Sequence, residues 1–348
     1  MIVVFVLNDD HFLFIYDNKE KHKSVDMNTL TDNLEITRNA IATYNTTNSI
    51  AHYTSIDVLK NIASGVYHNQ GEYFINLRAT DGSQTNDRGE LMLGHDYLME
   101  TLYQLESING YNEDKYRLST YQENIKCLEK YKQYSDEEIG SSLSKLFFGG
   151  IRKPYIICFT TRIDDLNIWN SSYGNNGKGI CLIFNFEKMK FDNPRILVNE
   201  PLRVVYGNDP GYLEERTILF KAIDTVYCEY VRTVETMSDE DAILQLKIAQ
   251  IEVLCSFVSS YFKTEDWREE SEVRIVCMLK HEMFNSEICY CEKTRKGYLN
   301  IPIPLSILKQ IYIGPCVKTP QIKEIKECAK VLKVAPENVI ISNKPLRC

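Results

Sequence analysis

The chain has 348 residues, of which 44% are hydrophobic and 25% are charged, a composition typical of a globular protein with a substantial core. Its formal net charge of -8 argues against nucleic-acid binding through overall electrostatic attraction, although a local basic groove stays compatible with such binding. The sequence contains no apolar run of about 18 residues, so it predicts no membrane-spanning helix.

The N-terminal stretch MIVVFVLNDDHFLFIYDNKEKHK is apolar, but it lacks a basic start and contains Asp9 and Asp10. We interpret residues 1–16 as two strands that turn at NDD, not as an export signal. The absence of such a signal predicts a cytoplasmic protein. The 11 scattered cysteines fit reduced core thiols, and CYC at 289–291 has no partner with zinc-ligand spacing, so we expect no zinc site, and no metal is assigned to the leading interpretation.

The first half of the chain mixes short strands with helices. The expected elements are a helix over 26–45, a strand over 49–55, a helix over 55–65, a strand and polar loop over 71–90, and a mostly helical insertion over 90–148. In the third of these, Ser55 has the residue type of an N-cap and Gly65 that of a helix end.

The second half alternates apolar runs with one strongly periodic segment. Apolar residues between 239 and 263 recur at helical spacing, and Ser238 with Asp241 resembles a capping box at its start. Expected strands lie within 154–162, 177–186, 194–207, 263–280, 287–303, 310–315 and 338–342, with a last helix over 320–333. No repeat or linker divides the chain, so residues 1–348 are predicted to form a single α+β domain with a mixed central sheet of short strands.

The segment KTEDWREESEVRIVCMLK, residues 263–280, carries charges where it enters the core. In a strand, Glu270, Glu272 and Arg274 would share one face, while Val273 and Ile275 would face the core. Two arrangements stay open: Glu272 simply pairs with Arg274 on a surface sheet face, or the two glutamates form a carboxylate pair that faces a pocket.

Several short motifs in the chain resemble the bacterial DUF2971 family, a domain of unknown function, over about residues 50–345. They are HYTS at 52–55, Asn86, Asp87 and Glu90, CFT at 158–160, Trp169, Tyr173, GKG at 177–179, Lys263, Trp267, Glu270, Glu272, Arg274 and IYIGP at 311–315. The resemblance excludes residues 1–45, which form an N-terminal strand and helix extension, and much of the 90–148 insertion.

The order of these motifs also resembles ADP-ribosyltransferases, which place His or Arg on an early strand, a Ser/Thr-rich strand next, and Glu-x-Glu at the opening of a later strand. This resemblance aligns His52, the Thr160–Thr161 pair and Glu270-Ser271-Glu272 with that pattern. It implies an ADP-ribosyltransferase-like sheet and an enzyme that consumes NAD as its substrate, with an acceptor that stays open. A bacterial toxin or a phage-defence effector is the expected biological setting.

The resemblance also implies a role for each residue. Glu272 would stabilise the cation that forms when the nicotinamide–ribose bond breaks, and Glu270 would orient or deprotonate the acceptor. His52 would hold the adenosine-side ribose or phosphate, and Thr160 would brace the catalytic carboxylate. Tyr53 or Tyr173 would stack on nicotinamide. The residues expected to contact NAD are His52, Tyr53, Thr160, Thr161, Tyr173 and Arg274.

Two different functions fit the same sequence. Asp87, Glu90, Glu270 and Glu272 could hold Mg²⁺ in a metal-dependent hydrolase or nuclease, and the chain could instead be a non-catalytic binding module. Trp169 and Trp267 are expected to be core anchors. The polar loop at 78–90 is expected to move or to cover the cleft.

Overall fold

The computed structural model describes residues 2–6, 12–16, 49–82, 90–119, 153–187, 191, 193–207, 210–280 and 282–346. Its strands are β1 Ile2–Val6, β2 Phe12–Tyr16, β3 Ile50–Thr54, β4 Tyr67–Asn69, β5 Glu72–Asp81, β6 Tyr155–Thr160, β7 Ile180–Phe184, β8 Ile196–Val198, β9 Leu202–Arg203, β10 Val205–Tyr206, β11 Phe262–Lys263, β12 Glu272–Leu279, β13 Cys289–Tyr290, β14 Gly297–Pro304, β15 Leu308–Ile313 and β16 Val339–Ile341. Its α-helices are α2 Ile56–Ser64, α3 Glu90–Asn109, α6 Leu166–Asn170, α7 Leu213–Glu235, α8 Glu240–Ser259 and α9 Thr319–Val331.

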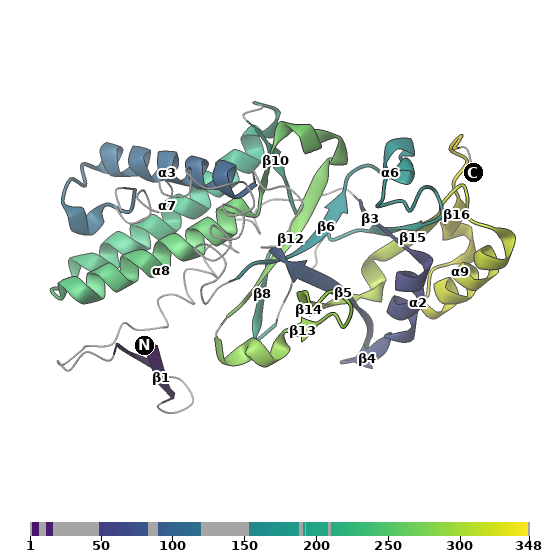
Figure 1. Ribbon diagram of the computed structural model, residues 1–348, viewed down its shortest axis with the longest axis horizontal. Coiled ribbons are helices and arrows are strands. Elements are labelled where there is room, and N and C mark those ends of the chain that lie inside the picture. The colour runs from purple at the N-terminus through teal and green to yellow at the C-terminus, as the bar shows by residue number, and fades with distance from the viewer. Residues whose placement is uncertain are drawn as a thin grey trace.

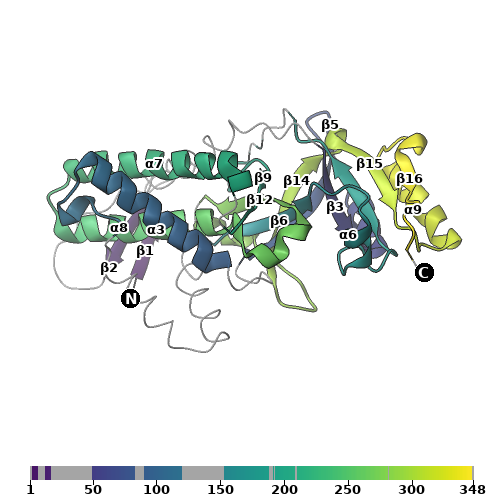
Figure 2. The same cartoon turned by 90° about the horizontal axis from the view of Figure 1, so that it is seen from above.

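A bundle of long helices occupies one end of the molecule, and a mixed sheet with α2 and α9 occupies the other (Figure 1). Seen from above, α3 crosses α7 and α8 within the bundle, away from α9 and β16 (Figure 2). None of the helices that the structure describes is long and apolar enough to cross a membrane. The molecule is therefore an α+β protein, as predicted.

The main sheet forks at β6. The strand β12 pairs antiparallel with β6 along one edge, over all six residues of β6. The opposite edge is shared, because the end of β5 pairs with the first two residues of β6 while Ala51 of β3 pairs with Thr160, its last residue. One branch then continues through β5, β14 and β13, and the other through β3, β7, β15 and β16. Most pairs are antiparallel, but β15 and β16 are parallel, so the sheet is mixed.

Two large hydrophobic cores meet at β12. Val273 and Ile275 belong to the core of the sheet, whereas Val276 and Met278 belong to the core of the helical bundle. This division follows from the alternation of side chains along a strand. Glu272 and Arg274 lie on the same face as Val276, so the charged residues occupy the start of the bundle-facing side of β12.

Helix α2 begins and ends where its local sequence predicts. The Ser55 side chain accepts a hydrogen bond from the backbone N–H of Val58, and Gly65 follows the last turn. Before α8, by contrast, the side chain of Asp239, not the predicted Ser238, accepts a hydrogen bond from the N–H of Ala242. Residues 26–45, predicted to be helical, lie outside the described residues.

The helical region is larger than the insertion predicted over 90–148. Within that range the structure describes α3 and a short 3₁₀ turn at Asp114–Tyr116, and α3 packs on α7 and α8. Helix α7 is not among the elements expected from the sequence. Its buried face contains Ile218, Leu219, Ala222, Ile223, Val226, Tyr227, Tyr230, Val231 and Val234, the three- and four-residue spacing of an amphipathic helix. That periodicity could therefore have predicted α7 from the sequence.

The cysteines are only partly as expected. Cys181, Cys255 and Cys277 are buried free thiols. Cys158 is also a free thiol but is accessible, and Cys316 is disulfide-bonded. The prediction of reduced core thiols therefore holds for the three buried cysteines, holds only for the reduced state of Cys158, which is exposed, and fails for Cys316.

Candidate functional site

Glu272 is the first residue of β12 and lies in a buried cluster of four charges. Its carboxylate accepts two hydrogen bonds from Arg274, from Nε and from Nη2, each 3.0 Å long. The Lys263 ammonium lies 3.0 Å from the Glu272 carboxylate and 2.6 Å from that of Glu270. Lys263, Glu272 and Arg274 are 5%, 5% and 1% exposed. We call these two bases and two acids the charge quartet.

The quartet is anchored by neighbouring backbone and side-chain groups. Arg274 donates from Nη1 to the carbonyl of Ser260 at the end of α8, and the backbone N–H of Glu272 donates to the Tyr206 hydroxyl. Such bonds are required because a buried charge without partners costs several kcal/mol. Of the two arrangements left open by the sequence, the pairing of Glu272 with Arg274 is present, but the pair is buried and does not lie on a surface sheet face.

The quartet keeps Glu272 ionised. Burial on its own would raise the pKa of this carboxyl, but the charges of Arg274 and Lys263 outweigh that effect and lower it to about 2. The pKa of Lys263 is correspondingly raised, because the carboxylates of Glu272 and Glu270 outweigh the effect of its burial. Both side chains are thus charged throughout the neutral pH range.

This arrangement predicts a specific acid sensitivity. The pKa of Glu272 falls from 4.5 to about 2 on folding, so its contribution to stability is complete above about 4.5 and is lost as the pH falls towards 2. Urea unfolding between about pH 7 and pH 2 should show this decrease, and Glu272→Gln should show a smaller one. An equal pH dependence in the variant would contradict the assignment.

Glu270 does not belong to the strand, contrary to the sequence prediction. It ends a 3₁₀ turn, Glu265–Glu270, and Ser271 follows with a left-handed φ of 44° before β12 begins. Thr160 donates from its hydroxyl to the Glu270 backbone carbonyl over 2.6 Å. Thr160 therefore holds the main chain of this turn, and it does not brace the Glu272 carboxylate as predicted.

His52 lies on β3 at the fork, where β3 separates from β6. Its Nδ1 lies 2.9 Å from the carbonyl oxygen of Cys158, beyond the Ala51–Thr160 pair where the two strands separate. Because a carbonyl only accepts, Nδ1 carries the proton and Nε2 is left as an acceptor. Burial lowers the pKa of His52 despite this bond, so the ring is neutral at neutral pH. A free acceptor suits a ribose hydroxyl, whereas the predicted phosphate role requires a hydrogen-bond donor, which Nε2 of the neutral ring is not.

Two tyrosines lie near His52 and differ in their contacts. The Tyr53 hydroxyl donates to the carbonyl of Arg162 and accepts from the N–H of Asp165, and its ring meets Trp169 edge to face at 4.8 Å. Tyr173 is 41% exposed, and burial together with the nearby charge of Glu270 raises the pKa of its hydroxyl. Tyr173 is thus the tyrosine placed to cover a ligand, while Tyr53 is held by its neighbours.

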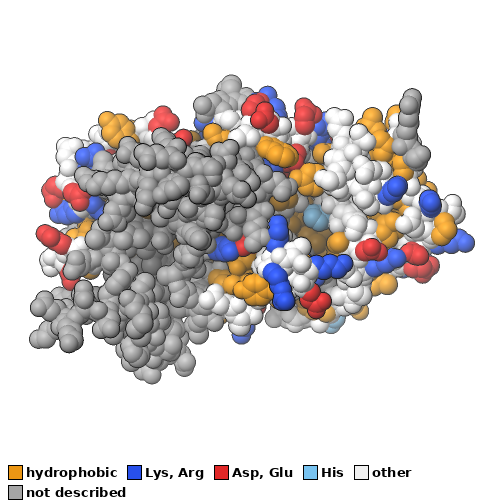
Figure 3. All heavy atoms as spheres, in the orientation of Figure 1, with side chains coloured by type: hydrophobic (Ala, Val, Ile, Leu, Met, Phe, Trp, Pro, Cys, Tyr) orange, Lys and Arg blue, Asp and Glu red, His pale blue; other side chains and the backbone are white. Residues whose placement is uncertain are grey.

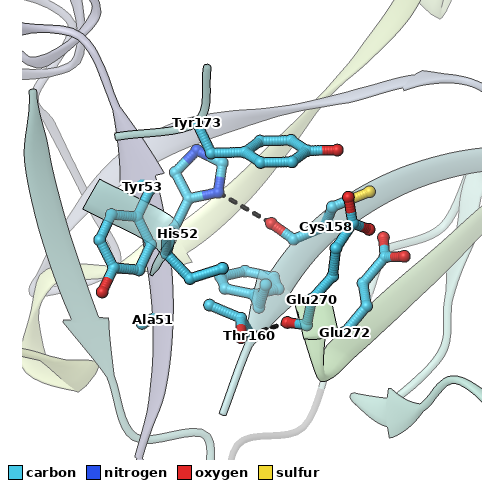
Figure 4. Close-up of a pocket in the computed structure, with 10 residues that line it drawn as sticks. Ala51, His52, Tyr53, Cys158, Thr160, Tyr173, Glu270 and Glu272 are labelled. Carbon is cyan, nitrogen blue, oxygen red and sulfur yellow. Dashed lines mark hydrogen bonds between the residues drawn. The ribbon is translucent and has the colours of Figure 1, made fainter. Parts of the chain in front are cut away.

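These residues surround one pocket of about 140 Å³ at the fork. Its lining contains Ala51, His52, Tyr53, Cys158, Phe159, Thr160, Ile168, Tyr173, Glu270 and Glu272. In Figure 4, His52 and Tyr53 form one side, Glu270 and Glu272 the other, and the Tyr173 ring lies above them.

The pocket brings together six of the eight predicted site residues. The two outside its lining are Thr161, which is exposed, and Arg274, which lies beside Glu272 within the quartet. No role was predicted for Cys158 or Lys263, although both occur in the family motifs. The signal for Lys263 was a charged residue at the end of an apolar run, and the signal for Cys158 was its place in the CFT motif.

The two tryptophans differ. Trp169 is fully buried, as predicted for a core anchor. Trp267 is only partly buried, and its ring lies 5.1 Å from the Lys263 ammonium, a cation–π contact at the edge of the quartet.

The residues proposed for a metal site do not all lie in the described chain. Residues 83–89, which include Asp87, are outside it, and nothing is described for the side chain of Glu90. The predicted gating loop falls mainly on the same residues, and its first part, through Asp81, is strand β5. Among the described residues no group of three or more His, Cys, Asp or Glu could hold a metal ion.

The fold and the site therefore define an α+β protein with a small pocket that holds two carboxylates and lies at a fork of its sheet. Residues 168–275 match the model of the DUF2971 family, described as a protein of unknown function. The match begins in α6 and ends in β12, so it includes Tyr173, Lys263 and the two glutamates but not His52 or Thr160. It confirms the DUF2971 resemblance over these residues. Neither a curated protein nor a solved structure matches the chain.

Proposed function

We propose that this chain is an NAD-consuming enzyme of the ADP-ribosyltransferase or NAD glycohydrolase type, with its active site in the pocket at the fork. The observation that carries the proposal is the convergence of His52, Thr160, Tyr173, Glu270 and Glu272 on that pocket from four separate segments. Their order along the chain is the order that the ADP-ribosyltransferase pattern requires.

The charge state of each side chain suits the reaction. Cleavage of the nicotinamide–ribose bond sends its electron pair to the nicotinamide nitrogen and leaves an oxocarbenium-like cation at ribose C1′. Glu272 is ionised at neutral pH, so its carboxylate can stabilise this cation. Lys263 and Arg274 hold that carboxylate in place, which makes them positioning residues.

The remaining side chains then have defined tasks. His52 accepts a hydrogen bond from a ribose hydroxyl at Nε2, and Tyr173 covers the nicotinamide ring. Water or another acceptor forms the new bond to C1′, and its proton passes to the carboxylate of Glu270. The acceptor therefore approaches from the 3₁₀ turn, which is the more exposed side of the site.

The charge quartet weighs against the metal-dependent hydrolase. An ammonium and a guanidinium already occupy positions beside Glu270 and Glu272, and both would repel Mg²⁺. The deciding experiment incubates the purified chain with NAD and measures free nicotinamide with and without EDTA. Release that survives EDTA supports the proposal. Phosphodiester cleavage that EDTA abolishes would support the hydrolase instead, and neither activity would support a binding module.

Glu270→Gln is expected to separate transfer from hydrolysis. The variant loses the base for the acceptor but keeps the ionised Glu272, so it should lose most labelling of an acceptor and retain part of its nicotinamide release. The two products are measured in parallel on the purified variant. Equal losses of both would show that Glu270 does not act on the acceptor side.

A further inference from the structure

The pocket is too small to hold a whole dinucleotide. Its volume is about 140 Å³, whereas sites that enclose a drug-sized ligand usually measure roughly 300–1,000 Å³. If the proposed function holds, the pocket takes the nicotinamide ribose, and the diphosphate and adenosine lie on a surface beside it.

The cations in and around the pocket are already paired. Lys263 and Arg274 bind the two glutamates of the quartet. At the rim, Arg162 donates to Asp165 and to Glu269. The diphosphate therefore needs other cations, close to the mouth of the pocket.

Strand register places Arg78 beside the pocket. In the antiparallel pair of β5 and β6, Thr80 lies opposite Ile156, so the two residues share a face of the sheet. Counting two residues onward in β6 reaches Cys158, which lines the pocket, and counting two residues back in β5 reaches Arg78. Both lie on that same face, about 5–10 Å apart if the separation is one or two strand spacings. Arg78 is exposed.

The turn of the β13–β14 hairpin carries three more cations on the side of Arg78 away from Cys158, near the end of β5 where Asp81 pairs with Tyr155. Lys293, Arg295 and Lys296 are exposed residues of this turn, in which Glu292 is the acidic residue. The Arg78 guanidinium lies over the ring of Tyr298, 4.4 Å from its centre, at the start of β14.

None of these four cations forms an ion pair with another residue in the described part of the chain. The ion pairs found there all involve other lysines, arginines and a histidine. Figure 3 shows Lys and Arg side chains gathered beside a hollow in which a histidine side chain is visible. This concentration of positive charge contrasts with the formal net charge of -8.

We propose that Arg78 binds the diphosphate of NAD while the nicotinamide ribose enters the pocket, and that Lys293, Arg295 and Lys296 support this contact by their charge; these four residues are here called the basic edge. The planar guanidinium of Arg78, held by its stacking on Tyr298, can donate two parallel hydrogen bonds to a phosphate. The three turn residues add flexible charge on the side of Arg78 away from the pocket.

The test measures binding of ADP, which has the diphosphate and lacks nicotinamide. Arg78→Gln is expected to weaken ADP binding by about tenfold, the loss of one charge-assisted hydrogen bond, and Lys296→Gln should weaken it by a smaller factor. Lys326→Gln is the matched control, because this exposed lysine of α9 lies away from the hairpin and forms no ion pair among the described residues. Higher salt should weaken binding to the parent chain and affect Arg78→Gln less.

Kinetics separate this subsite from the proposed reaction. In Arg78→Gln the KM for NAD should rise by about the same factor as the ADP dissociation constant, with kcat little changed, because the contact is made equally in ground and transition states. Nicotinamide release with unchanged KM and unchanged ADP binding would overturn the subsite and leave the reaction standing. Weakened ADP binding without any release by the parent chain would support the subsite and refute the reaction.

If a single-stranded oligonucleotide binds through Arg78 and ADP does not, the basic edge serves nucleic acid and the subsite is refuted. Melting temperatures of both variants control for folding.

Discussion

Glu272→Gln is expected to reduce nicotinamide release from NAD by about 10²–10³-fold, because it removes the negative charge that stabilises the ribose cation and keeps the shape of the side chain. Transfer to any acceptor should fall by the same factor, since both products pass through that cation. The measurement is single-turnover nicotinamide release by the purified variant. A folded variant that releases nicotinamide at the parent rate would remove Glu272 from the mechanism.

Because Glu272 is a buried member of the charge quartet, its substitution needs two control variants. Glu106→Gln changes another buried carboxylate, one that accepts hydrogen bonds from Ser119 in the helical part and does not line the pocket, so it should keep its activity. Glu272→Gln on its own leaves Lys263 and Arg274 facing a single carboxylate. The double variant Glu272→Gln/Arg274→Met restores the balance of charges. If it folds, its release rate should be as low as that of Glu272→Gln.

Arg274→Met should lower the free energy of unfolding by about 3–5 kcal/mol, the usual cost of removing one partner from a buried ion pair. The side chain is 1% exposed, and its loss leaves Lys263 as the remaining cation of the quartet beside Glu272. Urea unfolding at pH 7 measures the change. The matched control is Arg232→Met, whose pair with Glu229 on α7 is exposed and should contribute at most about 1 kcal/mol.

The double variant also tests the coupling between the two residues. Because it removes both members of the pair, its loss of stability should be smaller than the sum of the losses in Glu272→Gln and Arg274→Met. Strict additivity, or a loss below about 1 kcal/mol for Arg274→Met, would show that the two side chains do not act as a buried pair.

Local sequence predicted the elements whose signals lie within a few residues. Helix α2 follows from its apolar spacing between Ser55 and Gly65, and the core-facing positions Val273 and Ile275 follow from alternation in β12. The same reasoning placed Glu270 in that strand and was wrong, because Ser271 adopts a left-handed conformation and the strand begins only after it, at Glu272. The alternation of polar and apolar residues cannot reveal such a break, because a serine in the sequence does not indicate a left-handed conformation.

Residue type and motif order were thus enough to select His52, Thr160, Tyr173 and the two glutamates as candidates. Their assembly was decided by pairings between distant strands, because β3, β6 and β12 must meet in one register for these side chains to share a pocket. The charge of Glu272, the proton position on His52 and the role of Lys263 were also decided there. Each depends on a neighbour across the fold, and burial strengthens these charge interactions because little water remains to screen them.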